Sequence, residues 1–387
     1  MRKLLALLST LALAVLGSAL GQEPIKIGVV ISETGPAAAL GIPQKNTVVL
    51  WERVINDAGG ISGHPVEFVV YDDATSPDQA VQAARRLVEQ DQVVALIGAT
   101  AIPPTLSLQQ VAAEAGVPLL AIAPVVEHND WSFQITRATI DMLHAVAEHI
   151  AQQGHQRLGY IGYDDALGDD FINGLRAFED EYGFEVVTDE RFARTDTSVA
   201  GQVLRVLSAQ PDAVFIGASG TVATIPHRTL VERGFAGDIY HTHAVLNPGF
   251  LQLGEEYIEG AVVPSDPIVV IDQIGEGFPG LDVGREYKEL YEAEYGAGTV
   301  STQGAYAVDA VKVLEAAIAA ALENASPADL GALRTAIRDE ILAIDGLPGV
   351  TGTLSFGPDK RVGVDFSTVV LVEVRDNDWR FLRDFTE

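Results

Sequence analysis

Short runs of β-branched residues alternate with longer amphipathic segments along most of the chain. The first run, 25–31, predicts a buried strand, and the next segment, 37–57, predicts a helix that stops at Gly59-Gly60. A loop of small residues, 32–36, connects the two. Because the start of a helix carries free N–H groups and the positive end of the helix dipole, this junction suits an anionic group.

The same order of strand, loop and helix is repeated, first up to about residue 122 and again from about residue 140. This alternation calls for a parallel sheet with helices on both faces. We therefore expect an α/β fold with two doubly wound units. The expected strands of the first unit are 25–31, 65–71, 93–97 and 118–122, and those of the second are 157–163, 184–187, 213–216 and 239–241.

The last third of the chain has a different pattern. It offers three helices, at 283–295, 305–323 and 328–343, but only two strand-like segments, 352–356 and 367–374. These strands are too few for a third α/β unit, so we expect the segment to complete the first two. This predicts two lobes joined by three crossings, with residues 22–137 and 265–355 in lobe 1 and residues 138–264 and 356–387 in lobe 2.

Residues 1–21 fit a secretory signal peptide. Arg2 and Lys3 precede an apolar run, 4–16, and a stretch of small residues ends at Gly21, after which we expect cleavage. The run is too short to span a bilayer comfortably. The chain has no cysteine, which excludes disulfides, thiolate metal sites and lipid attachment through an N-terminal cysteine. We expect a periplasmic protein that begins at Gln22 and does not insert into a membrane.

The formal net charge of the chain is −29. Such an acidic surface argues against nucleic acid as a partner, because nucleic-acid binding rewards basic patches. It argues equally against binding to anionic membrane surfaces. Solubility is the explanation that we prefer.

In open parallel sheets, ligands bind outside the carboxyl ends of the strands. This rule selects loops rich in Thr, Ser, Gly and Pro, which expose N–H and hydroxyl donors to a small polar or anionic ligand. The six selected loops are 32–41, 98–105, 123–131, 163–169, 217–226 and 241–247.

Signatures of catalysis are missing from these loops. Ser219 lacks the glycine spacing of a nucleophile elbow, and no glycine-rich nucleotide loop is present, so we expect neither an enzyme nor a cofactor. His241 and His243 alternate at a strand end, which predicts that their side chains project the same way. Glu127 or His128 could join them around a metal, but a third ligand is not identifiable, and we expect no metal site.

The chain contains, in this order, the segments IKIGVVISETGPAAALG, NDAGGISGHPVEFVVYDDATSPDQAVQAARRLV, LIGATAIPPTLSLQQVAAEAGVPLL, YIGYDDALGDDF, AYAVDA and TGTLSFGPDKRVGVDF. The combination resembles the extracytoplasmic solute-binding proteins of the branched-chain amino-acid (Leu/Ile/Val-binding) class, which are the receptors of ABC importers. The resemblance implies a type I periplasmic binding fold, a cleft between two lobes and closure of the lobes on a ligand. It also implies a small-molecule solute and the permease subunits of an ABC transporter as partners.

Amino-acid receptors of this class hold the ammonium of the ligand with an acidic residue after a second-lobe strand, and the carboxylate with first-lobe hydroxyl and N–H groups. The acidic position falls on His243, a hydroxyl position falls near Ile102 and another near Glu127, and aromatic positions fall near Leu167 and Ser219. The loops GATAIPPTLS, ARTDTSVAGQV and GASGTVATIP resemble instead the branch associated with aromatic and other small organic carboxylates.

We therefore expect ligand contacts from both lobes. N–H and hydroxyl groups would bind the anion, apolar side chains would enclose its body, and the imidazole of the second lobe would be a hydrogen-bonding or cationic partner. The expected ligand-binding residues are Thr34, Leu40, Thr100, Ala101, Ile102, Val125 and Glu127 in lobe 1, and Leu167, Ser219 and His243 in lobe 2.

The expected function is that of a receptor that captures a branched-chain amino-acid-like solute or a small organic carboxylate, aromatic ones included. Two alternatives stay open. A ligand-sensing module of a signalling receptor uses the same fold. A secreted hydrolase would need a nucleophile and base pair that the sequence does not display.

Overall fold

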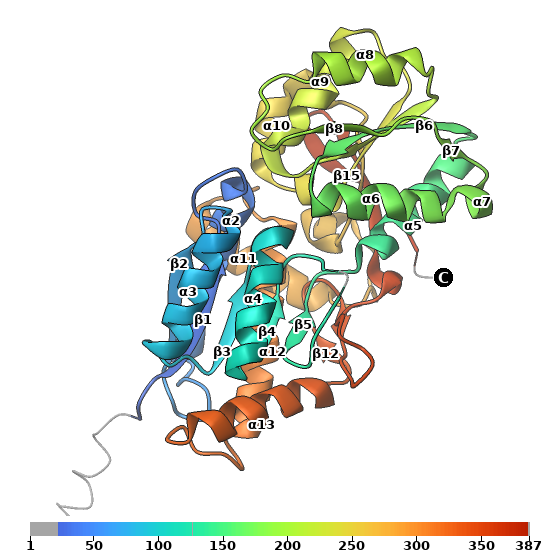
Figure 1. Cartoon of the computed structure of the whole chain (residues 1–387). Coiled ribbons are helices and arrows are strands. Elements are labelled where there is room, and N and C mark those ends of the chain that lie inside the picture. Colours follow the sequence, from blue (N-terminus) through green and yellow to red (C-terminus); the bar gives the residue numbers. More distant parts are fainter. Residues whose placement is uncertain (1–21, 126, 386–387) are drawn as a thin grey trace, which may run out of the picture.

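A computed structural model describes residues 22–125 and 127–385. The expected signal peptide lies outside these described residues. Two lobes, each built on its own sheet, lie one above the other (Figure 1). The predicted α/β class with parallel central sheets is confirmed.

The sheet of the first lobe has five parallel strands in the order β2-β1-β3-β4-β5. Strand β1, which lies between β2 and β3, is almost entirely buried, as the β-branched run 25–31 predicts. The last strand was not expected, because three residues are too few to form a readable pattern. The strands are β1 (Ile25–Ile31), β2 (Val66–Asp72), β3 (Ala95–Gly98), β4 (Leu119–Ala121) and β5 (Ser132–Gln134).

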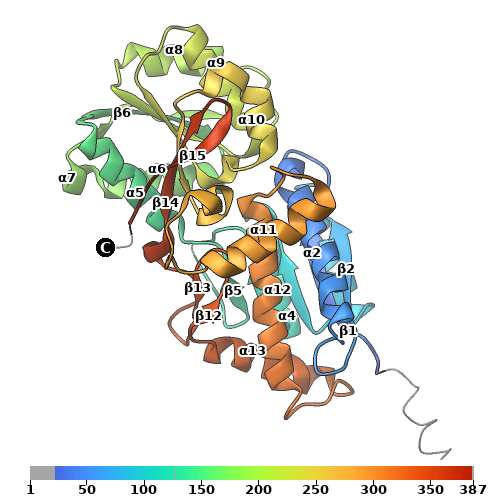
Figure 2. The ribbon, with the colours of Figure 1, turned by 180° about the vertical axis from the view of Figure 1, so that it is seen from behind.

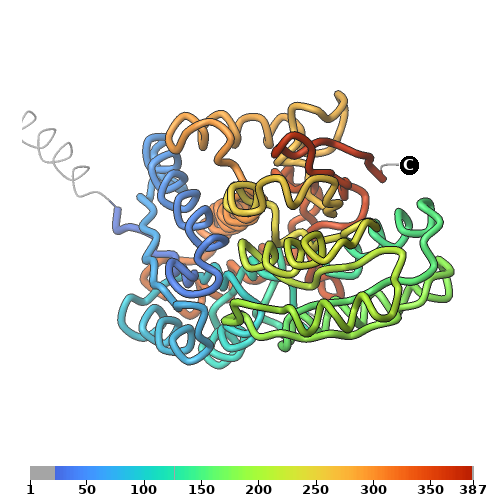
Figure 3. The backbone as a smooth tube through the Cα atoms, turned by 90° about the horizontal axis from the view of Figure 1, so that it is seen from above, coloured from blue at the N-terminus to red at the C-terminus, as the bar shows by residue number. Residues whose placement is uncertain are grey.

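Helices cover both faces of this sheet. On one face α3 (Pro77–Glu89) packs against α4 (Ile102–Ala115), as Figure 1 shows. On the other, α2 (Ala38–Asp57) lies beside α12 (Thr302–Ala321), which comes from the last third of the chain (Figures 2 and 3). Helix α11 (Leu281–Tyr295) also lies on this side, and α13 (Leu330–Ala343) packs against α12 at the lower end of the lobe in Figure 2.

The sheet of the second lobe has the strand order β15-β14-β11-β10-β9-β6-β7, with β8 paired to β6. Strands β6 to β11 are parallel, whereas β14 and β15 form an antiparallel hairpin at the edge beside β11. The strands are β6 (Arg157–Tyr163), β7 (Glu185–Val186), β8 (Glu190–Phe192), β9 (Ala213–Gly217), β10 (Asp238–His241), β11 (Val262–Ser265), β14 (Val370–Arg375) and β15 (Asp378–Asp384).

Helices again lie on both faces of the second sheet (Figure 1). They are α5 (Thr139–Gln152), α6 (Ala166–Ala177), α7 (Glu179–Tyr182), α8 (Ala200–Ser208), α9 (Thr224–Glu232) and α10 (Pro248–Gly254). A short hairpin of β12 (Leu347–Pro348) and β13 (Thr353–Leu354) precedes the C-terminal strands. The boundaries that the sequence analysis places at 137/138, 264/265 and 355/356 stay a prediction.

One buried arginine connects the segments at which the chain passes between the two sheets. The side chain of Arg137 is completely buried, and its Nε donates to Asp266 Oδ1 at 2.7 Å. Its Nη2 donates to the backbone oxygen of Thr351 at 2.6 Å and to the hydroxyl of Thr368, and its Nη1 donates to the backbone oxygen of Asp365. The guanidinium therefore joins the segment after β5 to the segment after β11 and to the segments that precede β14.

Replacing Arg137 with methionine removes this cation and leaves Asp266 buried without its ion-pair partner. We expect the free energy of unfolding to fall by about 3–5 kcal/mol, the usual cost of an uncompensated buried charge. Urea unfolding followed by tryptophan fluorescence measures the change.

The ion pair of Arg85 with Glu114 supplies a matched control. Arg85 Nη2 and Glu114 Oε2 lie 3.2 Å apart, but the two side chains are 53% and 65% exposed. Because exposed pairs contribute about 0–1 kcal/mol, Arg85→Met should leave the unfolding midpoint almost unchanged. If the two substitutions lower the free energy of unfolding equally, the buried contacts of Arg137 do not stabilise the fold more than an exposed ion pair does.

Candidate functional site

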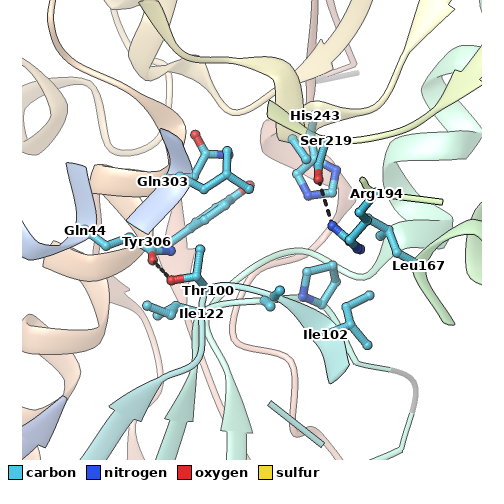
Figure 4. Close-up of a pocket in the computed structure, with 15 residues that line it drawn as sticks. Gln44, Thr100, Ile102, Ile122, Leu167, Arg194, Ser219, His243, Gln303 and Tyr306 are labelled. Carbon is cyan, nitrogen blue, oxygen red and sulfur yellow. Dashed lines mark hydrogen bonds between the residues drawn. The ribbon is translucent and has the colours of Figure 1, made fainter. Parts of the chain in front are cut away.

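A cavity lies between the lobes, at the carboxyl ends of both parallel sheets (Figure 4). Each of the six loops selected from the sequence contributes at least one residue to its wall. The lining residues are Leu40, Gln44, Thr100, Ala101, Ile102, Ile122, Ala123, Pro124, Leu167, Arg194, Ser219, His243, Ala244, Gln303 and Tyr306.

Seven of the ten expected ligand-binding residues line this cavity, and three do not: Thr34, Val125 and Glu127. The Thr34 hydroxyl donates instead to Asp72 Oδ2 at 2.6 Å, near the surface. The N–H group of Val125 donates to the buried side chain of Gln134 at 2.8 Å. Glu127 is exposed. None of these three residues lines the cavity, so their role as ligand contacts stays a prediction without support from the cavity.

The sequence analysis did not select four polar residues of the cavity: Gln44, Arg194, Gln303 and Tyr306. Gln44 lies inside α2, and Gln303 and Tyr306 lie on α12, so none of them is in a loop at a strand end. Arg194 follows the short strand β8. Arg194 and Tyr306 do occur within segments that carry the family resemblance, ARTDTSVAGQV and AYAVDA, and this was the available signal.

Arg194 is fixed on three sides. Its Nε donates to Asp165 Oδ2 at 2.6 Å, and its Nη1 donates to Ser219 Oγ at 3.3 Å. Its guanidinium lies over the ring of Tyr163, 4.2 Å from the ring centroid. Asp165 is itself held as the N-cap of α6. The remaining nitrogen, Nη2, is buried without a hydrogen-bond partner, so the residue offers one positively charged donor at the cavity.

The opposite wall presents the start of α4. Thr100, Ala101 and Ile102 line the cavity there, and no side chain caps the helix. The next two residues, Pro103 and Pro104, have no N–H groups, so the N–H of Ile102 is the donor that the start of this helix offers. The positive end of this helix dipole and Arg194 therefore face one cavity from different lobes.

The acidic residues near the cavity are already engaged. None of the described residues that line it is Asp or Glu. Asp165 binds Arg194, and Asp266 binds Arg137 and accepts a hydrogen bond from Tyr306 Oη at 2.5 Å. Through Tyr306, the cavity wall is connected directly to the buried ion pair at the crossings.

His243 lines the cavity as an uncharged group. Burial lowers the pKa of His243 to about 4, with Asp266 raising it and Arg137 lowering it by smaller amounts. Its Nδ1 has no hydrogen-bond partner. A neutral imidazole is thus a hydrogen-bonding group at pH 7 rather than a cationic partner.

The prediction that His241 and His243 project the same way is wrong. Strand β10 ends at His241, and the chain turns into a short 3₁₀ helix at His243, which breaks the alternation. His241 lies instead against His227, with 2.8 Å between Nε2 of the first and Nδ1 of the second. Within the described residues, no group of three or more potential metal-binding side chains occurs.

Residues 24–377 match the sequence family described as periplasmic binding protein. The chain belongs to this family. It is similar to an extracellular ligand-binding receptor from Rhodopseudomonas palustris HaA2, with 35% identity, 94% of this chain and 100% of that chain covered, and a TM-score of 0.88. It is also 25% identical over 318 residues to the Leu/Ile/Val-binding protein homolog 7 of Brucella abortus, covering 76% of this chain and 77% of that protein.

The fold is that of type I periplasmic binding proteins. A leucine-binding protein from Thermotoga maritima shares it with a TM-score of 0.81 at 20% identity, covering 93% of this chain and 98% of that chain. As a periplasmic binding protein, the molecule is a solute-binding receptor of an extracytoplasmic family. In the described part of the chain, no helix is both long and apolar enough to cross a membrane.

The uncharged state of His243 can be checked directly. With ¹³C-labelled histidine, the His243 resonance of the ligand-free protein should stay in its neutral position down to about pH 5, because burial lowers its pKa to about 4. His243→Asn assigns the resonance by its disappearance. A midpoint close to the ordinary histidine pKa of about 6.5 would contradict the buried, neutral assignment.

Proposed function

We propose that this protein is the soluble receptor of an ABC importer and that it captures a small organic carboxylate without an ammonium group. The observation that carries the proposal is the free, buried Nη2 of Arg194 in a cavity whose described lining contains no acidic residue. The lobes would close on the solute and deliver it to a membrane permease. The link to an importer rests on the class that the sequence resembles and on the periplasmic binding family.

Electrostatics favours a carboxylate over an amino acid. A carboxylate between Arg194 and the start of α4 would receive a charge-assisted hydrogen bond from one lobe and the N–H of Ile102, at the positive end of the helix dipole, from the other. An ammonium group in the same cavity would be buried without a negative partner, which is costly. The neutral imidazole of His243 provides at most one acceptor.

The remaining lining residues fit this role. Leu40, Ile102 and Leu167, with Ile122 and Pro124, would enclose the apolar body of the solute. The seven expected residues of the cavity remain the proposed ligand contacts, with Ser219 and His243 beside the carboxylate.

We also propose that the chain is exported by its signal peptide and performs no catalysis. Ser219 Oγ accepts a hydrogen bond from Arg194, and none of the hydrogen bonds among the described residues joins Ser219 to a histidine. The serine therefore lacks the base that a hydrolase would need.

Matched ligands test the charge argument. By calorimetry, 4-methylpentanoate should bind more tightly than leucine, and Arg194→Gln should weaken its binding by about 10–150-fold, the range for a lost charged hydrogen bond of about 1.5–3 kcal/mol.

Arg205→Gln is the control for the charge change, because this arginine is in the same lobe, 61% exposed and paired with Glu190 at the surface. It should leave the dissociation constant unchanged. Tight binding of leucine with no detectable binding of 4-methylpentanoate would overturn the proposal.

Lobe closure is the second expectation. In the structure the lobes are in contact, because the 3₁₀ helix Gly220–Ala223 of lobe 2 lies against α2 of lobe 1. Small-angle X-ray scattering should therefore give a smaller radius of gyration with saturating ligand than without it, because the solute contacts both lobes. An identical profile in both states would contradict closure by a hinge.

A further inference from the structure

Two buried amides line the cavity on the side opposite Arg194. Gln44 is 1% exposed and Gln303 is 4% exposed. Figure 4 shows both, with Thr100 and Tyr306, across the cavity from Arg194, Ser219 and His243. Nε2 of Gln44 and Oε1 of Gln303 have no hydrogen-bond partner. Buried polar groups are normally paired, so two unpaired ones at a ligand cavity point to the ligand as their partner.

The unpaired group of Gln44 is its NH₂ donor, because the surrounding hydrogen bonds occupy its amide oxygen. The backbone N–H of Ser32 donates to Thr100 Oγ1 at 2.9 Å. The hydroxyl proton of Thr100 is then free to be given to Gln44 Oε1, 2.7 Å away. Because the amide oxygen is occupied by this bond, the NH₂ group is the part of Gln44 that remains for a ligand.

The two amides together specify the group that they can bind. Gln44 requires an acceptor, and Gln303 Oε1 requires a donor. A hydroxyl group can accept from one partner and donate to another, whereas a second carboxylate only accepts and would find no cation among the described residues on this side of the cavity. The hydroxyl of Tyr306 is not available to either amide as a donor, because it donates to Asp266.

We propose that Gln44 and Gln303 form a second polar subsite that binds an uncharged hydroxyl group of the solute, at the end remote from its carboxylate. The ligand class is then a hydroxycarboxylate with an apolar body between its two polar ends. This inference rests on the proposed function for the carboxylate end. Thr100 acts as a positioning residue, because it holds the amide of Gln44 in the donating orientation.

Two ligand pairs test the subsite in the wild-type protein: 4-hydroxyphenylacetate against phenylacetate, and 5-hydroxypentanoate against pentanoate. Calorimetry should show the hydroxylated member of at least one pair binding about tenfold or more tightly, as expected for one satisfied buried hydrogen bond. This comparison needs no variant and so does not depend on how a substitution folds.

Variants locate the effect. Gln44→Met and Gln303→Met keep a flexible chain of similar length without hydrogen-bonding groups, so each should remove most of the preference for the hydroxylated member of a pair. Thr100→Val should reduce the preference through the orientation of Gln44. Gln79→Met, at an exposed glutamine of α3, is the control and should retain it.

The outcomes separate the two proposals. If the carboxylates bind and Arg194→Gln weakens them, but hydroxylated and unhydroxylated members bind equally, the subsite is wrong and the carboxylate receptor stands. If the hydroxyl preference persists in both Gln44→Met and Gln303→Met, the subsite is assigned to the wrong residues. If no carboxylate of either kind binds, the proposed function fails and the subsite with it.

Discussion

The buried guanidinium of Arg137 joins the segments at which the chain passes between its two lobes. Arg137 has no access to water, so its charge is supported by the carboxylate of Asp266 and by oxygen atoms of Thr351, Asp365 and Thr368. A charge buried so completely is tolerated only when it is paired and hydrogen-bonded. The segments that these contacts join must therefore keep their mutual positions. The placement of the two sheets, and the cavity between them, depends on this set of contacts.

The same constraint shapes the electrostatics of the cavity. Asp266 is shared between Arg137 and Tyr306, and Asp165 is shared between Arg194 and the start of α6. The nearby carboxylates are paired within the protein, whereas the charged Nη2 of Arg194 and the amide donor of Gln44 remain unpaired at the wall. A cavity of this kind favours an anion with apolar walls around it, which is the basis of the proposed carboxylate specificity.

Much of this arrangement could be predicted because parallel sheets obey strong local and topological rules. Apolar runs located the long strands, and the carboxyl-end rule selected loops that all reach the cavity. The rule does not determine which residues of a loop line the cavity, which is why Thr34 and Glu127 were expected there but do not line it. Short strands such as β5 and β8 carry too few residues for a readable pattern, and Arg194 follows one of them.

By itself, the sequence determined the fold class, the repetition of strand, loop and helix, and the family resemblance, because these depend on neighbours a few residues apart. Only the tertiary structure decided which polar groups are left without partners. Gln44 becomes a free donor because Thr100, 56 positions away, occupies its oxygen, and His243 is neutral because distant elements bury it. Burial and hydrogen-bond competition are set by contacts remote in the chain, and no local pattern encodes them.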